Sequence, residues 1–195
     1  TGATPGSSGA VFSDIGVLAG VWNTDWSWSP LLADFDNDGQ KDLYITNGYR
    51  RDISNLDYLN YTAPKELANG LDPNRFKTID DYLKLIPSTP LHNYMFKNID
   101  GLNFENTGIQ WGFVQPSYSN GSAYSDLDND GDLEVIVNNI MDDIFIYKNK
   151  SVEKGGSNWL QVKLKGSPKN PQGTGSKIRI SYMGGKTQFV EITPT

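Results

Sequence analysis

Two short apolar runs, each preceded by a strongly polar stretch, set the pattern of this chain. They cover residues 43–46 and 133–137 and are rich in β-branched and aromatic side chains, which is typical of β-strands. Residues 159–164 place apolar side chains at alternate positions, which also predicts a strand. The pattern therefore predicts a mainly β chain.

Residues 49–91 have a different texture and predict short helices. Helical turns are expected at 57–61 and 63–70. A better helix candidate covers 78–86, with Thr78 as N-cap, acidic residues in the first turn and a proline as stop signal. We interpret 49–91 as a small helical insertion into a β scaffold.

The polar stretches and their flanks are repeated. Phe104 follows Phe12 by 92 positions, and residue 126 follows residue 34 by the same number. Residues 145–149 resemble residues 94–98 at a distance of only 51. The difference of 41 is the size of the insertion in the first copy. Without it the unit is about 51 residues long, which is the length of a four-stranded propeller blade.

The repeated polar stretches, residues 34–42 and 126–134, are acidic loops with the same layout. Carboxylates stand at loop positions 1, 3, 5 and 9, and glycine stands at position 6. Alternate residues of a tight turn can point hard oxygen ligands at Ca²⁺, and glycine permits the left-handed bend. An EF-hand would carry glutamate at position 12, where this chain has Ile45 and Val137. The loops predict calcium sites that lead into strands.

The charge balance agrees with localised metal sites. The formal net charge is −6, but nine of the 23 acidic residues lie in the two loops. The other 14 face 17 basic residues, and no basic stripe indicates a nucleic-acid partner. No apolar run has the length of a membrane span, and the absence of cysteine excludes disulfides.

The chain begins at Thr1, and we expect it to be part of a longer protein. Calcium sites of micromolar to millimolar affinity are filled reliably only outside the cytosol. We therefore expect an extracellular or cell-surface location.

Residues 26–39 and 120–132 resemble the FG-GAP/VCBS repeat of integrin-like β-propellers. Residues 158–166 and 173–178 resemble the start of an ASPIC/UnbV domain, which commonly follows such propellers. The resemblance implies two repeats over 1–150 and a partial ASPIC/UnbV-like β domain over 151–195. The expected fold is mainly β, with β-propeller-like blade repeats, a small α-helical insertion and a C-terminal β segment.

The resemblance also implies that the loops hold Ca²⁺ through their carboxylates and through the backbone oxygen at position 7. Glu134 departs from the usual Asp and is longer by one methylene. The implied metal ligands are Asp34, Asp36, Asp38, Gln40, Asp42, Asp126, Asp128, Asp130, Asp132 and Glu134.

The favoured function is a calcium-stabilised, non-enzymatic repeat segment acting in adhesion or in the binding of a glycan or protein ligand. One alternative is part of a polysaccharide-cleaving enzyme such as a calcium-bearing propeller lyase. Its candidate residues are Tyr49, Arg50, Arg51 and His92, although a lone histidine rarely marks catalysis. A structural spacer is the remaining alternative.

The tryptophans allow two interpretations. Trp22, Trp26 and Trp28 could form a sugar-stacking platform. The period-two placement of Trp26 and Trp28 favours packing against neighbouring strands instead. Trp159 is expected to be core or half-buried, in the strand predicted at 159–164.

Overall fold

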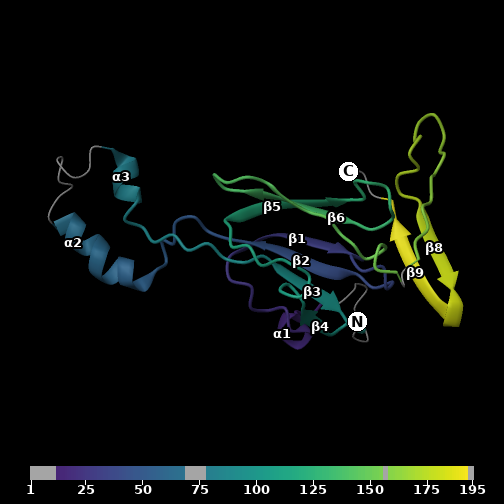
Figure 1. Ribbon diagram of the computed structural model, residues 1–195, viewed down its shortest axis with the longest axis horizontal. Helices are drawn as coiled ribbons and strands as arrows, with labels where there is room; N and C mark the ends of the chain where they lie inside the picture. Colours follow the sequence, from purple (N-terminus) through teal and green to yellow (C-terminus); the bar gives the residue numbers. More distant parts are fainter. Residues whose placement is uncertain (1–11, 69–77, 156–157, 193–195) are drawn as a thin grey trace, which may run out of the picture.

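The computed structural model describes residues 12–68, 78–155 and 158–192 of the 195-residue chain. The described chain is mainly antiparallel sheet with a few short helices, as the sequence predicts (Figure 1). Its strands form a four-stranded sheet, a three-stranded sheet and a two-stranded hairpin. Within the described residues these sheets do not close into a barrel.

The first sheet has consecutive antiparallel neighbours in the order β1-β2-β3-β4. Its strands are β1 (Ser27–Ala33), β2 (Asp42–Asn47), β3 (Tyr94–Asn98) and β4 (Phe104–Asn106). The run predicted at 43–46 is thus confirmed as the body of β2. A short helix, α1 (Gly16–Ala19), precedes the sheet.

The second sheet repeats the first. Its order is β5-β6-β7, with β5 (Ser119–Ser125), β6 (Glu134–Asn139) and β7 (Phe145–Tyr147). Both ends of β5 and of β6 lie 92 residues after the ends of β1 and β2. Each first pairing, β1 with β2 and β5 with β6, also has a register irregularity near the start of its first strand. The sequence repeat is therefore a structural repeat.

The two sheets pack against each other over a common core. Tyr44 of β2 and Val137 of β6 are fully buried in it, and β1 lies beside β5, where Ser122 Oγ donates to Ser29 Oγ at 3.0 Å. Burial of these apolar side chains is the main source of stability for such a sheet pair. The buried core cluster consists of Ala33, Phe35, Tyr44, Met95, Phe113, Val135 and Val137.

The helices α2 (Ala63–Ala68) and α3 (Ile79–Leu83) and a π-helical turn (Tyr58–Thr62) lie between β2 and β3 and extend away from the sheets (Figure 1). Thr78 caps α3 as predicted, through a capping box with Asp81. The helix ends three residues earlier than predicted. None of the described helices is long and apolar enough to cross a membrane.

The C-terminal segment forms a hairpin of β8 (Lys177–Tyr182) and β9 (Lys186–Glu191). The strand predicted at 159–164 is wrong, because those residues adopt no regular structure and pair with no strand of the described chain. Alternation identifies residues that could share a face, but a strand also needs a neighbour for its backbone hydrogen bonds.

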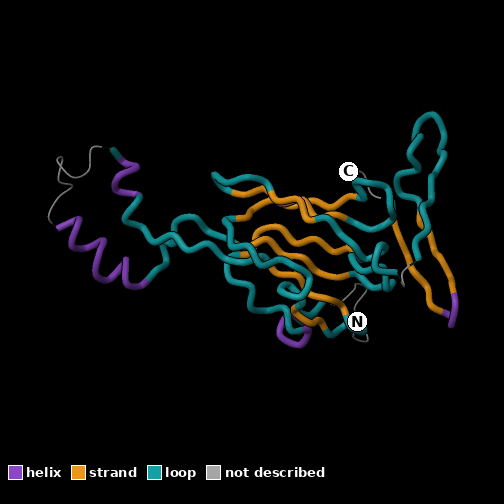
Figure 2. The backbone as a smooth tube through the Cα atoms, in the orientation of Figure 1, coloured by secondary structure: helices purple, strands orange, loops and turns teal. Residues whose placement is uncertain are grey.

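The strands at the two edges of each of the larger sheets differ in length. The seven-residue strands β1 and β5 pack beside each other, although most of their residues are exposed or half-buried. The outer strands β4 and β7 are only three residues long (Figure 2).

Candidate metal centres

Each acidic loop connects the first two strands of its sheet, and the two loops have the same backbone. The φ angle is 58° at Asn37 and 59° at Asn129. At the position-6 glycines it is 96° for Gly39 and 95° for Gly131. Asparagine and glycine adopt this left-handed region more easily than other residues. The repeated sequence thus makes two copies of one turn.

In each loop three carboxylates converge. One set is Asp34, Asp36 and Asp42; the other is Asp126, Asp128 and Asp130. Within each set, one oxygen from every carboxylate lies within 4.8 Å of the others. Like charges at this separation repel unless a proton or a cation intervenes.

In the first loop the pKa values of two carboxyl groups are raised, mainly by burial and partly by the neighbouring carboxylates. Burial raises the pKa of Asp34 to about 6, and the charges of Asp38 and Asp36 add to the shift. Burial also raises the pKa of Asp42 to about 7, against the lowering effect of two backbone N–H groups. A bound cation would favour the charged form of both carboxyl groups.

The position-9 carboxylates have a second role as hydrogen-bond acceptors. Asp42 is fully buried and accepts the N–H groups of Phe35 at 3.0 Å and Asn98 at 2.9 Å. Glu134 accepts the equivalent N–H groups, from Leu127 at 2.7 Å and Asn149 at 3.4 Å. The carboxylate at position 9 therefore ties its loop to the C-terminal end of β3 in the first sheet and to the segment after β7 in the second.

Asp132, at position 7 of the second loop, is fully buried and incompletely paired. Its Oδ2 accepts the N–H of Val152 at 3.0 Å, whereas its Oδ1 has no hydrogen-bond partner among the described residues. Burial raises the pKa of Asp132, and the neighbouring carboxylates of Asp130 and Glu134 add to the effect. An unpaired buried carboxylate oxygen is costly and suits a cation ligand.

Gln40, at position 7 of the first loop, turns its side chain away from the carboxylates. Its Nε2 donates to the carbonyl of Ile99 at 3.0 Å, so only its backbone remains for the role that the resemblance implies. Six of the ten predicted ligands thus lie in the two convergent sets. The other four, in the same loops, are Asp38, Gln40, Asp132 and Glu134.

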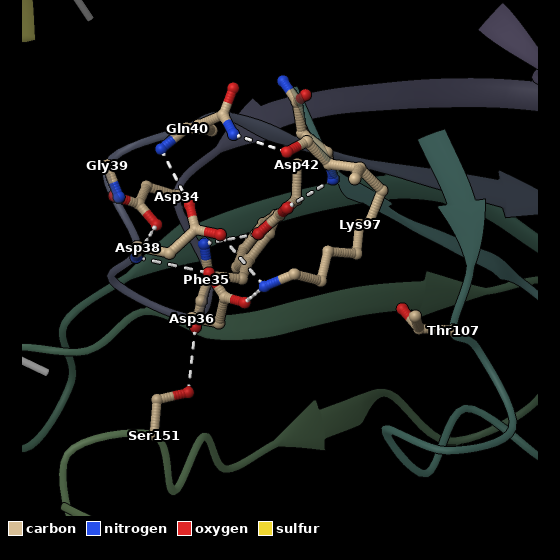
Figure 3. Close-up of polar contacts among 12 residues, drawn as sticks. Asp34, Phe35, Asp36, Asp38, Gly39, Gln40, Asp42, Lys97, Thr107 and Ser151 are labelled. Atoms are coloured by element: carbon tan, nitrogen blue, oxygen red, sulfur yellow. Dashed lines mark hydrogen bonds and ion pairs between the residues drawn. The ribbon is translucent and has the colours of Figure 1, made fainter. Parts of the chain in front are cut away.

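A lysine from the third strand, or from the residue directly after it, reaches each loop. Lys97 of β3 contacts the carboxylate of Asp36 and lies 3.0 Å from Asp38 Oδ2 (Figure 3). Burial lowers the pKa of Lys97, but its hydrogen bonds to the two aspartates outweigh burial and raise it. Lys148, after β7, lies 2.8 Å from Asp128 Oδ2, and this contact lowers the pKa of Asp128.

The loop sequences do not predict that these two lysines contact the carboxylates. The available signal was the dipeptide Lys97-Asn98, which recurs as Lys148-Asn149 at the end of the second aligned run. An ammonium group therefore lies against the position-3 carboxylate of both loops and offsets part of their negative charge.

A cavity of about 780 Å³ lies beside the first loop and is lined from both sheets. Its wall includes the aromatic rings of Trp111, Phe113 and Tyr147. Lys150 and Lys154 also line it, and neither has a carboxylate partner among the described residues. The cavity thus combines an apolar wall with these two lysines, and Asp36 and Asp38 of the first loop line it as well.

The expected core packing of the N-terminal tryptophans is wrong. The exposed fraction is 40% for Trp26 and 52% for Trp28, and both rings stack on Tyr49 with centroids 5.0 and 6.5 Å away. Trp22 is exposed as well. The face they share is not covered by another strand in the described chain.

The residues considered for polysaccharide cleavage do not form an interacting group among the described residues. In the segments that the structure describes, no hydrogen bond or ion pair links the side chains of Tyr49, Arg50, Arg51 and His92. His92 contributes only its carbonyl, which accepts from Asn47 Nδ2 at 3.1 Å.

Comparisons with protein-family models, with curated proteins and with solved structures found no match for this chain. The fold and the loops therefore define the class of protein. It is a β-sheet repeat protein with two acidic loops that could hold a metal ion.

Proposed function

We propose that the two acidic loops bind Ca²⁺ and that the ions stabilise the β-sheet repeats. The observation that carries the proposal is the duplicated convergence of three carboxylates on turns of the same backbone geometry. An isolated acidic turn is commonly solvated, but two copies in the same structural position favour metal binding over a solvated turn. The unpaired buried oxygen of Asp132 adds independent support.

The ligand chemistry favours Ca²⁺ over other metals. All ligands on offer are oxygens, the chain has no cysteine, and its one histidine lies outside both loops. Hard oxygen ligands suit Ca²⁺ and Mg²⁺ rather than zinc or copper. Mg²⁺ sheds its water reluctantly and is seldom enclosed by protein ligands alone. A Ca²⁺ ion would offset the carboxylate repulsion and fix the turn between two strands.

The test is thermal unfolding in about 2 mM Ca²⁺ and in excess chelator, with calorimetry to count the ions. An ion present at a hundred times its Kd stabilises by about 2.7 kcal/mol per site. For a chain of this size that raises Tm by roughly 2–4 °C per kcal/mol. We expect two ions per chain and a Tm that falls on chelation; Mg²⁺ at the same concentration is the control. An unchanged Tm with no calcium uptake would contradict the proposal.

We further propose that each repeat is a propeller blade of an exported or cell-surface protein. Support comes from the sequential antiparallel order of the first sheet and from the two first strands lying side by side. Blades are four-stranded sheets arranged around an axis. The requirement for Ca²⁺ favours a location outside the cytosol.

For such a protein we propose a binding or adhesion role rather than catalysis, with an anionic glycan as the favoured ligand of the cavity. Aromatic walls suit sugar rings, and the ammonium groups of Lys150 and Lys154 suit carboxylates. The test titrates the chain with trigalacturonate and, as a neutral control of equal length, maltotriose. We expect binding only of the acidic trimer, weakened in a K150Q/K154Q double variant. Equal binding of both trimers, or of neither, would exclude this ligand class.

A further inference from the structure

The two acidic loops touch each other directly. Asn37, at position 4 of the first loop, donates from Nδ2 to the carbonyl of Gly131 in the second loop at 3.0 Å. Both residues lie in the left-handed turns that wrap the convergent carboxylates. The hydrogen bond therefore joins a side chain of the first candidate site to the backbone of the second.

Residues 149–152, which we call the bridge segment, contact both loops at once. Asn149 Nδ2 donates to the carbonyl of Phe35 in the first loop at 2.7 Å. The same nitrogen donates to the carbonyl of Leu133 in the second loop at 3.2 Å. Ser151 Oγ adds a second hydrogen bond to Phe35, at 3.1 Å. The side chain of Asn149 thus links the two loops by hydrogen bonds to a backbone carbonyl of each.

The bridge segment also contacts the carboxylates of the second loop. The N–H of Val152 is 3.0 Å from Asp132 Oδ2, and the N–H of Asn149 is 3.4 Å from Glu134 Oε1. Any movement of these carboxylates toward an ion therefore acts on the residues that hold the first loop.

These contacts provide a physical basis for coupling between the sites. An ion at one loop orders that loop, its hydrogen-bonded partner and the bridge segment. The second ion then binds to a loop whose conformational entropy is already reduced, which raises its affinity. The mutual repulsion of two dications opposes this gain but is screened by salt.

We infer that the two loops act as one coupled unit, in which Ca²⁺ at either loop raises the affinity of the other through Asn37 and the bridge segment. The inference rests on the proposed calcium function and goes beyond it, since two independent structural sites would serve that function equally well.

The experiment measures calcium binding by isothermal calorimetry at fixed ionic strength. We expect two ions per chain with a Hill coefficient above 1. Site 1 is then disabled by a D34N/D36N double variant, and site 2 by D126N/D128N. Each should weaken the remaining site, by at least about 5-fold, the lower end of typical coupling. Thermodynamic linkage requires the two factors to be equal.

Two variants test the route. N149A removes the donor shared by both loops, and N37G removes the direct contact while a glycine accepts the left-handed backbone. Both should still bind two ions, with a Hill coefficient close to 1. N138A is the matched control, because Asn138 donates to Asn120 on an exposed face and touches neither loop. Circular dichroism verifies that each variant folds.

The outcomes separate the inference from the proposed function. Two ions bound independently, or a Hill coefficient of 1 or below, would overturn the coupling and leave calcium binding intact. Coupling that persists in both N149A and N37G would overturn the assigned route. No calcium uptake would overturn the proposed function itself.

Discussion

At the scale of single residues, Asp42 and Glu134 combine two roles that the sequence does not separate. Each stands where a metal ligand is expected, and each also accepts two backbone N–H groups from its own sheet. A buried N–H group without an acceptor costs about 1–3 kcal/mol. The position-9 carboxylate should therefore matter for stability even when no metal is present.

This distinction predicts different behaviour for two aspartates of the first loop. D42A should lower the free energy of unfolding by about 1–3 kcal/mol in chelator, because relief of the buried charge offsets part of the cost of two unpaired N–H groups. D36A, whose carboxylate accepts mainly from Lys97 and the loop itself, should reduce only the calcium-dependent part. Urea unfolding with and without Ca²⁺ measures both. Equal stability of D42A and the parent chain in chelator would refute the second role.

At the scale of elements, the repeat was readable from the sequence because strands, loops and spacing recur together. The apolar runs at 43–46 and 133–137 became β2 and β6, and the 92-residue spacing is exact for four strands. The prediction that Trp26 and Trp28 are buried was wrong. The alternation of Trp26 and Trp28 identifies a shared face, but exposure depends on whether another element covers that face, which alternation does not encode.

The candidate site was predictable in the same partial way. The spacing of carboxylates identified both loops, since ligands at alternate positions of one turn depend only on local geometry. The side chains of Lys97, Lys148 and Asn149 come from β3 and from the residues that follow β7, and nothing in the loop sequence reveals them. Their only signal is the recurrence of Lys-Asn in both repeats.

The packing of β1 beside β5 predicts a specific cross-link. Ser29 and Ser122 have hydroxyl oxygens 3.0 Å apart, and the chain has no cysteine of its own. An S29C/S122C variant should form an intramolecular disulfide under mild oxidant, seen as a gel-mobility shift reversed by reductant. S29C/S181C is the control, since Ser181 lies on the β8–β9 hairpin. Failure of S29C/S122C to cross-link would show that the two first strands are not adjacent.

At the scale of the whole molecule, the C-terminal segment lies on both acidic loops. A Cβ atom on Gly39 would collide with the Tyr182 hydroxyl, and one on Gly131 would collide with the Trp159 ring. The position-6 glycine of each loop therefore faces an aromatic side chain from the chain after residue 157. The contacts of this segment with the rest of the chain therefore include the surfaces of the two acidic loops.

The contact of Trp159 with the second loop predicts a selective effect of a single methyl group. G131A should displace the ring and increase trypsin cleavage between residues 158 and 192. G112A is a matched control, because its φ of 94° is close to the 95° of Gly131 while a Cβ there meets nothing within 4 Å. Both variants carry a similar backbone penalty of about 1–2 kcal/mol. Equal cleavage of the two would argue against docking through Trp159.

The unequal lengths of the strands have a consequence for behaviour at high concentration. Fibril growth by strand addition favours exposed segments of six or seven residues. The outward-facing strands β4 and β7 offer about 10 Å of backbone each at ordinary strand rise, whereas the seven-residue strands β1 and β5 pack beside each other. The six-residue strands of the hairpin carry Lys177, Arg179 and Lys186, whose charges resist stacking. The outermost strands of the two larger sheets therefore offer little backbone for self-association, whether or not the acidic loops hold a metal ion.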